Sequence, residues 1–176
     1  MDVLTNVHAV SVTSVGSASK TQHALDLLFE YQKREEKIEI MVFDISPQKE
    51  IPSDLLDYEQ KPFFKSVPSL ADVLVHVEEI QPSGIVINNI HFACKKENSY
   101  QKVMRQLYAI AEKLDAFGFL RANFSLMIIT GREETEDAHN NEATQAVIGF
   151  CGKRITLGSD FPRTFLVPEE FKIPKK

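Results

Sequence analysis

Short apolar runs alternate along this chain with longer stretches of helical periodicity, and this alternation limits the possible folds more than any other feature. Residues 85–87, Ile-Val-Ile, form a continuous apolar run that is typical of a strand buried on both faces of a sheet. The longer stretches repeat apolar residues at i, i+3 and i+4, as amphipathic helices do. The pattern predicts strands over residues 7–12, 38–45, 84–88, 124–129 and 153–158, and helices over 20–34, 69–80, 99–117 and 142–150.

This order of elements predicts an α/β fold, because parallel strands need crossover connections, which are usually helical. We expect a flavodoxin-like three-layer sandwich with a five-stranded parallel sheet in the order 2-1-3-4-5. The 176 residues are expected to form a single domain with an irregular tail over residues 159–176. The proline-rich residues 47–68 are expected to be a long connection without regular structure.

Composition argues against several classes of protein. The net charge of −5 is unlike that of a general nucleic-acid binder, which usually carries a basic patch. No apolar stretch approaches the length of a membrane span, and the first residues lack the features of a signal peptide. Cys94 and Cys151 form no redox pair, so we expect two buried thiols and a cytoplasmic protein. The histidines show none of the spacings of a zinc or iron site, and no metal is expected.

Residues 16–21, Gly-Ser-Ala-Ser-Lys-Thr, join the first predicted strand to the first predicted helix and form the strongest candidate for a binding site. A hydroxyl-rich loop at a helix N-terminus can hold a phosphate, because backbone N–H groups and the positive end of the helix dipole face it. The loop has neither the glycines of GxGxxG nor the spacing of GxxxxGK[ST], since Lys20 lies only four residues after Gly16. It suits a single terminal phosphate, as in flavin mononucleotide (FMN). A helix N-cap at Ser19 or Thr21 explains the same residues without a ligand.

Ligands of an open parallel sheet bind at the carboxyl ends of its strands, near the point where the strand order reverses. In the predicted order, the loops after the first, third and fourth strands meet at that point. The candidate site therefore combines residues 16–21, residues 88–94 and the loop from Thr130 onward.

On these three loops the chain resembles the NADPH-dependent FMN reductase family of flavodoxin-like proteins, and within it the small flavin reductases of sulfonate monooxygenase systems. The similarity rests on Gly16-Ser17, on Ile-Pro-Ser-Asp-Leu-Leu at residues 51–56 and on Thr130-Gly131, and it extends over most of residues 7–165. It implies FMN as cofactor, NAD(P)H as electron donor and a homodimer or homotetramer. Electrons would pass to free flavin, a quinone or a partner monooxygenase. The cofactor carries the chemistry, so no catalytic side chain is expected.

The resemblance also implies which residues bind FMN. In the first loop, around Gly16, the hydroxyls of Ser17, Ser19 and Thr21 would hold the phosphate, and Lys20 would add positive charge. In the second loop, Asn89, His91 and Phe92 would line the dimethylbenzene or ribityl side of the flavin. In the third loop, Thr130, Gly131 and Arg132 would approach its pyrimidine edge.

The second and third loops depart from the family's pattern. Ile90 and Phe92 stand where a proline and a tyrosine are usual, and Arg-Glu-Glu at residues 132–134 replaces glycines. These departures keep a second interpretation open. In it, the chain is a flavodoxin-like domain that has lost flavin and serves as a protein interaction or assembly module.

Overall fold

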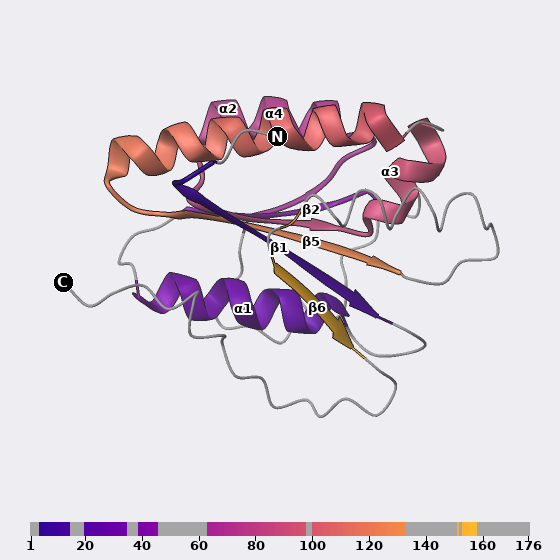
Figure 1. The fold of residues 1–176 in the computed structure, drawn as a ribbon, viewed down its shortest axis with the longest axis horizontal. Helices are drawn as coiled ribbons and strands as arrows, with labels where there is room; N and C mark the ends of the chain where they lie inside the picture. Colours follow the sequence, from indigo (N-terminus) through magenta and orange to yellow (C-terminus); the bar gives the residue numbers. More distant parts are fainter. Residues whose placement is uncertain are drawn as a thin grey trace.

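A computed structural model describes residues 4–14, 20–34, 39–45, 63–97, 100–132, 151 and 153–157. Within these ranges the chain forms a parallel sheet with helices on both faces (Figure 1), so the predicted α/β class is confirmed. The elements are β1 (Val7–Ser14), α1 (Lys20–Arg34), β2 (Ile40–Asp44), β3 (Phe63–Ser66), α2 (Leu70–Ile80), β4 (Gly84–Asn88), α3 (Ile90–Glu97), α4 (Tyr100–Arg121), β5 (Ser125–Arg132) and β6 (Lys153–Leu157).

The order of the strands differs from the prediction. The described sheet has six strands in the order β3-β2-β4-β5-β1-β6, so the five strands and the order 2-1-3-4-5 are wrong. β1 lies between β5 and β6, where Val10 is the register partner of both Ile128 and Lys153. β2 and β4 pair directly with each other, which leaves no place for β1 between them. Helical crossovers permit several orders, and hydrophobic periodicity does not distinguish among them.

β3 is a strand that the sequence analysis missed. It lies within the proline-rich segment that was expected to lack regular structure, and it pairs with β2. Pro62 directly precedes the strand and Pro68 follows it closely, so the strand is only four residues long. Prolines at both boundaries are compatible with a short edge strand, because neither removes a hydrogen bond from its interior.

The core divides into two clusters, one on each face of the sheet. Val86 of β4 packs with Leu25 and Leu28 of α1, whereas Ile85 and Ile87 pack under the helices of the opposite face. Successive strand residues point to opposite faces, so this apolar run is buried on both sides, as predicted. The crossover from β1 to β2 uses α1, and the crossovers back across the sheet use α2, α3 and α4 on the other face (Figure 1). Because the later crossovers run in the opposite direction across the sheet and also lie on its opposite face, they have the same handedness as the first crossover.

The helix boundaries follow local signals in the sequence. α1 spans residues 20–34, as predicted. Ser69 caps α2: its hydroxyl accepts a hydrogen bond from the Asp72 N–H at 3.4 Å and donates one to the Asp72 carboxylate at 2.7 Å. The predicted helix over 99–117 begins at Tyr100 and continues to Arg121. The helix predicted over 142–150 and the tail over 159–176 lie outside the described residues.

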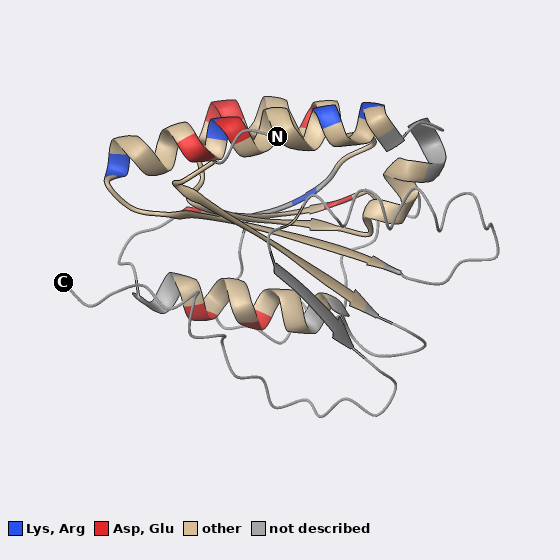
Figure 2. Ribbon diagram, in the orientation of Figure 1, with Lys and Arg blue, Asp and Glu red and all other residues tan. Residues whose placement is uncertain are grey.

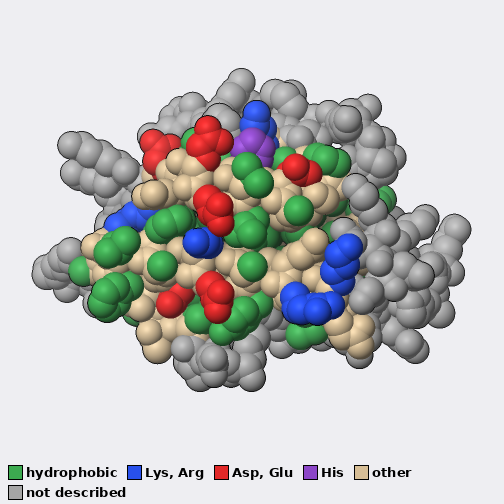
Figure 3. Space-filling model, turned by 90° about the horizontal axis from the view of Figure 1, so that it is seen from above, with side chains coloured by type: hydrophobic (Ala, Val, Ile, Leu, Met, Phe, Trp, Pro, Cys, Tyr) green, Lys and Arg blue, Asp and Glu red, His purple; other side chains and the backbone are tan. Residues whose placement is uncertain are grey.

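Charged side chains lie mainly on the outer surfaces of the helices, whereas the described strands carry few of them (Figure 2). The outer surface of α2 and α4 mixes acidic, basic and apolar side chains (Figure 3). Four large apolar side chains are exposed there: Val75, Ile80, Phe119 and Leu120. No helix in the described part of the chain is long and apolar enough to cross a membrane.

Candidate functional site

A group of polar side chains gathers at the carboxyl ends of β2, β4 and β5, next to the start of α1. The strand periodicity explains their direction. Val42, Val86 and Ile128 pack on the face that α1 covers, and the residues two positions further along the same strands keep to that face. We call this group the carboxyl-edge cluster; it consists of Thr21, Asp44, Asn88, Asn89 and Thr130.

Asn88 is the centre of this cluster. Its Oδ1 accepts hydrogen bonds from the hydroxyl of Thr21 at 2.9 Å and from the hydroxyl of Thr130 at 2.6 Å. All three residues are buried: Asn88 is 2% exposed, Thr21 is 8% exposed and Thr130 is 0% exposed. An amide oxygen has two lone pairs, and both are occupied here. These bonds tie the first turn of α1 to β4 and β5.

Asn89 extends the network to β2. Its backbone N–H donates to the Thr130 hydroxyl at 2.9 Å, and its Nδ2 donates to Asp44 Oδ1 at 3.2 Å. A φ of 66° places Asn89 in the left-handed region, which asparagine adopts more readily than most residues. Asp44 is 3% exposed, so its carboxylate depends on such donors in place of water.

One kind of donor in the cluster remains for a ligand. The Thr21 oxygen gives its proton to Asn88 and keeps only lone pairs, which do not bind an anion, whereas the Nδ2 hydrogens of Asn88 make no hydrogen bond within the described part of the chain. The adjoining first turn of α1 contains no acidic residue. Its first N–H groups have no partner within the helix, so an anion at this end is favoured by both the donors and the dipole.

Part of the predicted binding site falls outside the described residues. Gly16, Ser17 and Ser19 lie there entirely. Lys20 begins α1 and Arg132 ends β5, but the description does not extend to their side chains. The binding roles predicted for these residues therefore stay predictions.

Three of the expected regions do come together. Thr21 after β1, Asn88 at the end of β4 and Thr130 at the end of β5 are joined by hydrogen bonds. They meet although the predicted strand order is wrong, because β5 lies between β1 and β4 and all three strands are parallel. Gly131 follows Thr130 within β5 and is buried.

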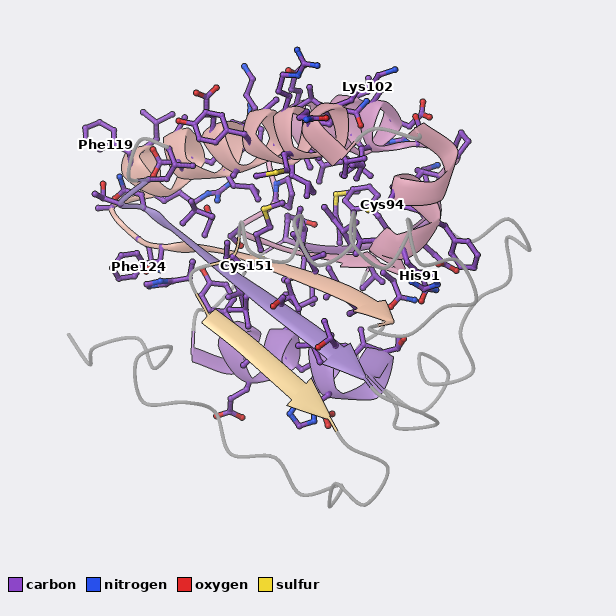
Figure 4. All side chains as sticks on the ribbon, turned by 45° about the vertical axis from the view of Figure 1, so that its right-hand side comes forward. His91, Cys94, Lys102, Phe119, Phe124 and Cys151 are labelled. Carbon is purple, nitrogen blue, oxygen red and sulfur yellow. The ribbon has the colours of Figure 1, made fainter. Side chains whose placement is uncertain are left out.

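The segment after β4 is a helix and not the expected polar loop. α3 begins at Ile90, and its buried residues Ile90, Ala93 and Cys94 follow the helical spacing i, i+3 and i+4. Phe92 packs against the core cluster under α2 and α4, with its ring 4.4 Å from that of His91. Figure 4 shows His91 near the carboxyl end of the sheet and Cys94 turned inward from the same helix. Phe92 is thus a partly buried side chain that packs against the core.

Asp44 lies outside the regions predicted from the sequence, and Asn88 lies within the predicted region 88–94 but was not singled out as a binding residue. Each is the polar last residue of an otherwise apolar strand: Gly-Ile-Val-Ile-Asn for β4 and Ile-Met-Val-Phe-Asp for β2. A buried strand that ends in an amide or a carboxylate is a recognisable signal, since the carboxyl edge of a parallel sheet is where ligands bind.

Two buried thiols were predicted. Cys94 is buried, whereas Cys151 is of intermediate exposure, and partial burial raises the pKa of the Cys151 thiol to about 12. Among the described residues, no group of three or more His, Cys, Asp or Glu side chains is placed to hold a metal ion. A comparison of the chain with protein-family models and with curated proteins finds no match.

Proposed function

We propose that this chain is a nucleotide-binding domain in which the start of α1 and the carboxyl-edge cluster hold the phosphate groups. The observation that carries the proposal is the pair of hydrogen bonds by which Asn88, at the end of β4, holds the hydroxyls of Thr21 and Thr130. These bonds hold the hydroxyl of Thr21, in the first turn of α1, against the carboxyl ends of β4 and β5.

The start of α1 at Lys20 changes how the preceding loop is compared with known motifs. Residues 14–21, counted back from Lys20 and Thr21, read Ser-Val-Gly-Ser-Ala-Ser-Lys-Thr, and this is the length of GxxxxGK[ST] with serines at both glycine positions. In that motif the lysine reaches the β- and γ-phosphates, and the hydroxyl of the last residue lies beside them. This match in length is not apparent when Gly16 is taken as the first glycine of the motif.

β4 supplies the second half of the comparison. In P-loop nucleotide-binding proteins an aspartate and the P-loop hydroxyl together hold Mg²⁺. In this chain the hydroxyl of Thr21 meets Asn88, a neutral amide that ends the apolar strand β4. Among the described residues, Asn88 therefore does not supply the negative charge that this aspartate gives to Mg²⁺. We assign no catalytic step to a metal, and the proposal is limited to binding.

The FMN reductase hypothesis remains a second and less favoured candidate. It places the loop after β4 next to the phosphate loop and against the flavin ring. In the described sheet β5 separates β1 from β4, and Phe92 packs against the core. A phosphate held at the start of α1 is common to both hypotheses, so the distinguishing property is the preferred nucleotide.

Titration with a fluorescent ATP analogue and, separately, with FMN tests the proposal. We expect the triphosphate to bind, and Lys20→Ala to weaken it about tenfold to a hundredfold, since a hydrogen bond to a charged group contributes about 1.5–3 kcal/mol. Lys113→Ala is the matched control, because Lys113 is a half-exposed residue of α4 whose ion pair with Glu78 spans 3.8 Å.

The possible results separate the three hypotheses. Binding of FMN with flavin absorbance near 450 nm, and no binding of the triphosphate, would contradict the proposal and support the reductase. Binding of neither nucleotide would contradict both and leave the interaction module.

A further inference from the structure

We propose that the outer surface of α2 and α4 is the contact between two copies of this chain, related by a two-fold axis. The inference is independent of the proposed function, because it concerns a surface of two helices and not the carboxyl edge of the sheet. We call this surface the α2/α4 face (Figure 3). It is made by exposed residues of both helices: Val75, Glu78, Glu79, Arg105, Lys113, Ala116, Phe119 and Leu120.

The α2/α4 face exposes large apolar side chains. Phe119 is 71% exposed, Leu120 is 80% exposed and Val75 of the neighbouring helix is 59% exposed. Phe119 points away from the fold near the end of α4 (Figure 4). Exposed apolar groups that gather on one face among polar residues mark a site of protein association, whereas scattered single ones do not.

The amino-edge end of this face is held as one unit. The Arg121 guanidinium donates hydrogen bonds to the backbone carbonyls of Gln81 and Pro82, which directly follow α2. It also lies 5.7 Å from the centre of the Phe117 ring. These contacts tie the end of α4 to the end of α2, so a partner does not bear the cost of ordering them.

The charges of the two helices indicate which partner fits. The charged residues of α2 are all acidic, namely Asp72, Glu78 and Glu79. Those of α4 are mainly basic: Lys102, Arg105, Lys113 and Arg121 against Glu112 and Asp115. One of the two acidic residues, Asp115, is already bonded to the Asn6 N–H at 2.7 Å. An acidic helix beside a basic one is complementary to a second copy of the same pair.

A two-fold axis brings the unlike helices together. α2 and α4 each connect two parallel strands, so both run from the carboxyl edge to the amino edge. An axis parallel to them lays α2 of each copy on α4 of the other, with equivalent levels facing each other. Lys113 Nζ and Glu78 Oε1 lie 3.8 Å apart within one copy, so Glu79 of α2 meets the second copy at the level of its Lys113.

The size of the face is sufficient for a dimer. α4 has 22 residues and is about 33 Å long, and two packed helices are about 20 Å wide. This area is of the same order as the about 800 Å² that each partner buries in a specific interface.

Sedimentation velocity of the full chain over a range of protein concentrations measures the association. One variant reverses the charge of α2, with Glu78→Lys and Glu79→Lys. A second variant reverses that of α4, with Arg105→Glu and Lys113→Glu. Circular dichroism checks that each variant folds.

The matched control is Asp26→Lys with Glu30→Lys. It makes the same change of charge as the α2 variant, but on α1, which covers the opposite face of the sheet (Figure 1).

We expect the natural chain and the control to form dimers with dissociation constants that agree within about twofold. Each charge-reversed variant alone should dimerise at least about tenfold more weakly, because like charges then face each other across the axis. An equimolar mixture of the two variants should dimerise as the natural chain does, since each copy then offers the charge that the other lacks. Phe119→Ser with Leu120→Ser should also weaken the dimer at least about tenfold, without a change of charge.

Three results would overturn the inference. A natural chain that stays monomeric at about 0.1 mM would leave the face to a different protein. A dimer that all the variants retain would place the contact on another surface. Folded variants whose mixture does not dimerise would contradict the pairing of α2 with α4. None of these results bears on nucleotide binding, which is measured separately.

Discussion

The two edges of the sheet are both polar, but their polar groups are bonded in different ways. At the amino edge, side chains bond to the backbone: the Ser125 hydroxyl donates to the Leu114 carbonyl at 2.7 Å, and the Tyr31 hydroxyl donates to the Phe124 carbonyl. The backbone N–H of Asn6 donates to Asp115 Oδ1 at 2.7 Å. At the carboxyl edge, the hydroxyls of Thr21 and Thr130 bond to another side chain, Asn88.

This difference separates structural from functional roles. Side chains at the amino edge hold loops and strand ends in place, because they form hydrogen bonds with the backbone. The side chains of the carboxyl-edge cluster position one another, and the Nδ2 hydrogens of Asn88 make no hydrogen bond within the described part of the chain. We therefore expect changes at the amino edge to lower stability alone, and changes at the carboxyl edge to lower both stability and nucleotide affinity.

Asn88→Ala should have the largest effect. It removes the acceptor of both Thr21 and Thr130, and each buried hydroxyl proton left without an acceptor costs about 1–3 kcal/mol. Urea unfolding should show the loss of stability, and titration of the remaining folded protein should show weaker nucleotide binding. Asn123→Ala is the control at the other edge. If folded Asn88→Ala bound the nucleotide with unchanged affinity, the proposed difference between a structural amino edge and a nucleotide-binding carboxyl edge would be contradicted.

Gly118→Ala should destabilise the fold without changing the site. A Cβ at this buried position of α4 would lie 2.4 Å from the Asn6 carbonyl oxygen and 2.7 Å from that of Asn123, both backbone atoms. The overpacking should lower the free energy of unfolding by about 1–3 kcal/mol. At Gly84 the closest contact is the Leu28 side chain, at 2.8 Å, which can rotate away. Gly84→Ala should therefore cost less, and the reverse ranking would contradict this explanation.

Ser125→Ala tests the amino edge of the sheet and is expected to cause a smaller loss of stability. The change removes one buried hydrogen bond, to the Leu114 carbonyl, and should lower the free energy of unfolding by about 0.5–1.5 kcal/mol. Ala71→Ser, on the exposed side of α2, should stay within about 0.5 kcal/mol of the natural chain. Nucleotide affinity should be unchanged in both variants. A loss of affinity in Ser125→Ala would show that the two edges are coupled.

The smallest expected effect is a dependence of stability on pH that arises from two histidines. Burial lowers the pKa of His23 in α1 below its ordinary value of 6.5, partly opposed by Asp26, and burial also lowers the pKa of His8 in β1. The unfolded chain then binds more protons than the folded one, so stability is highest above pH 6.5 and falls as pH decreases through the lowered folded pKa. Urea unfolding at several pH values should be less pH-dependent for His23→Gln, and an identical dependence would exclude His23 as a cause.

Elements with a strong local signal could be predicted from the sequence. The boundaries of α1 follow from its apolar spacing, and the start of α2 follows from the Ser69 cap. The strand order could not be predicted, because the apolar residues of β1, β4 and β5 record burial and not the identity of the neighbouring strand. β3 was hidden by the prolines at its ends.

The candidate site was predictable to the same limited extent. The hydroxyl of Thr21 stood out because it begins a helix after a strand. Asn88 did not, because a polar residue after an apolar run is also what the beginning of a loop looks like. Its role depends on a partner in α1, far away in sequence, which only the packing of that helix against β4 and β5 brings within 2.9 Å.

The position of β1 has a consequence for how the chain is made. Val7 of β1 pairs with Ser125, and β6, the other neighbour of β1, lies later still in the sequence. During synthesis β1 therefore remains without either of its neighbours until β5 has been made, whereas β2 and β4 can pair earlier. The addition of β1 to the sheet is a late, long-range step, and we expect refolding from urea to be slow for a domain of this size.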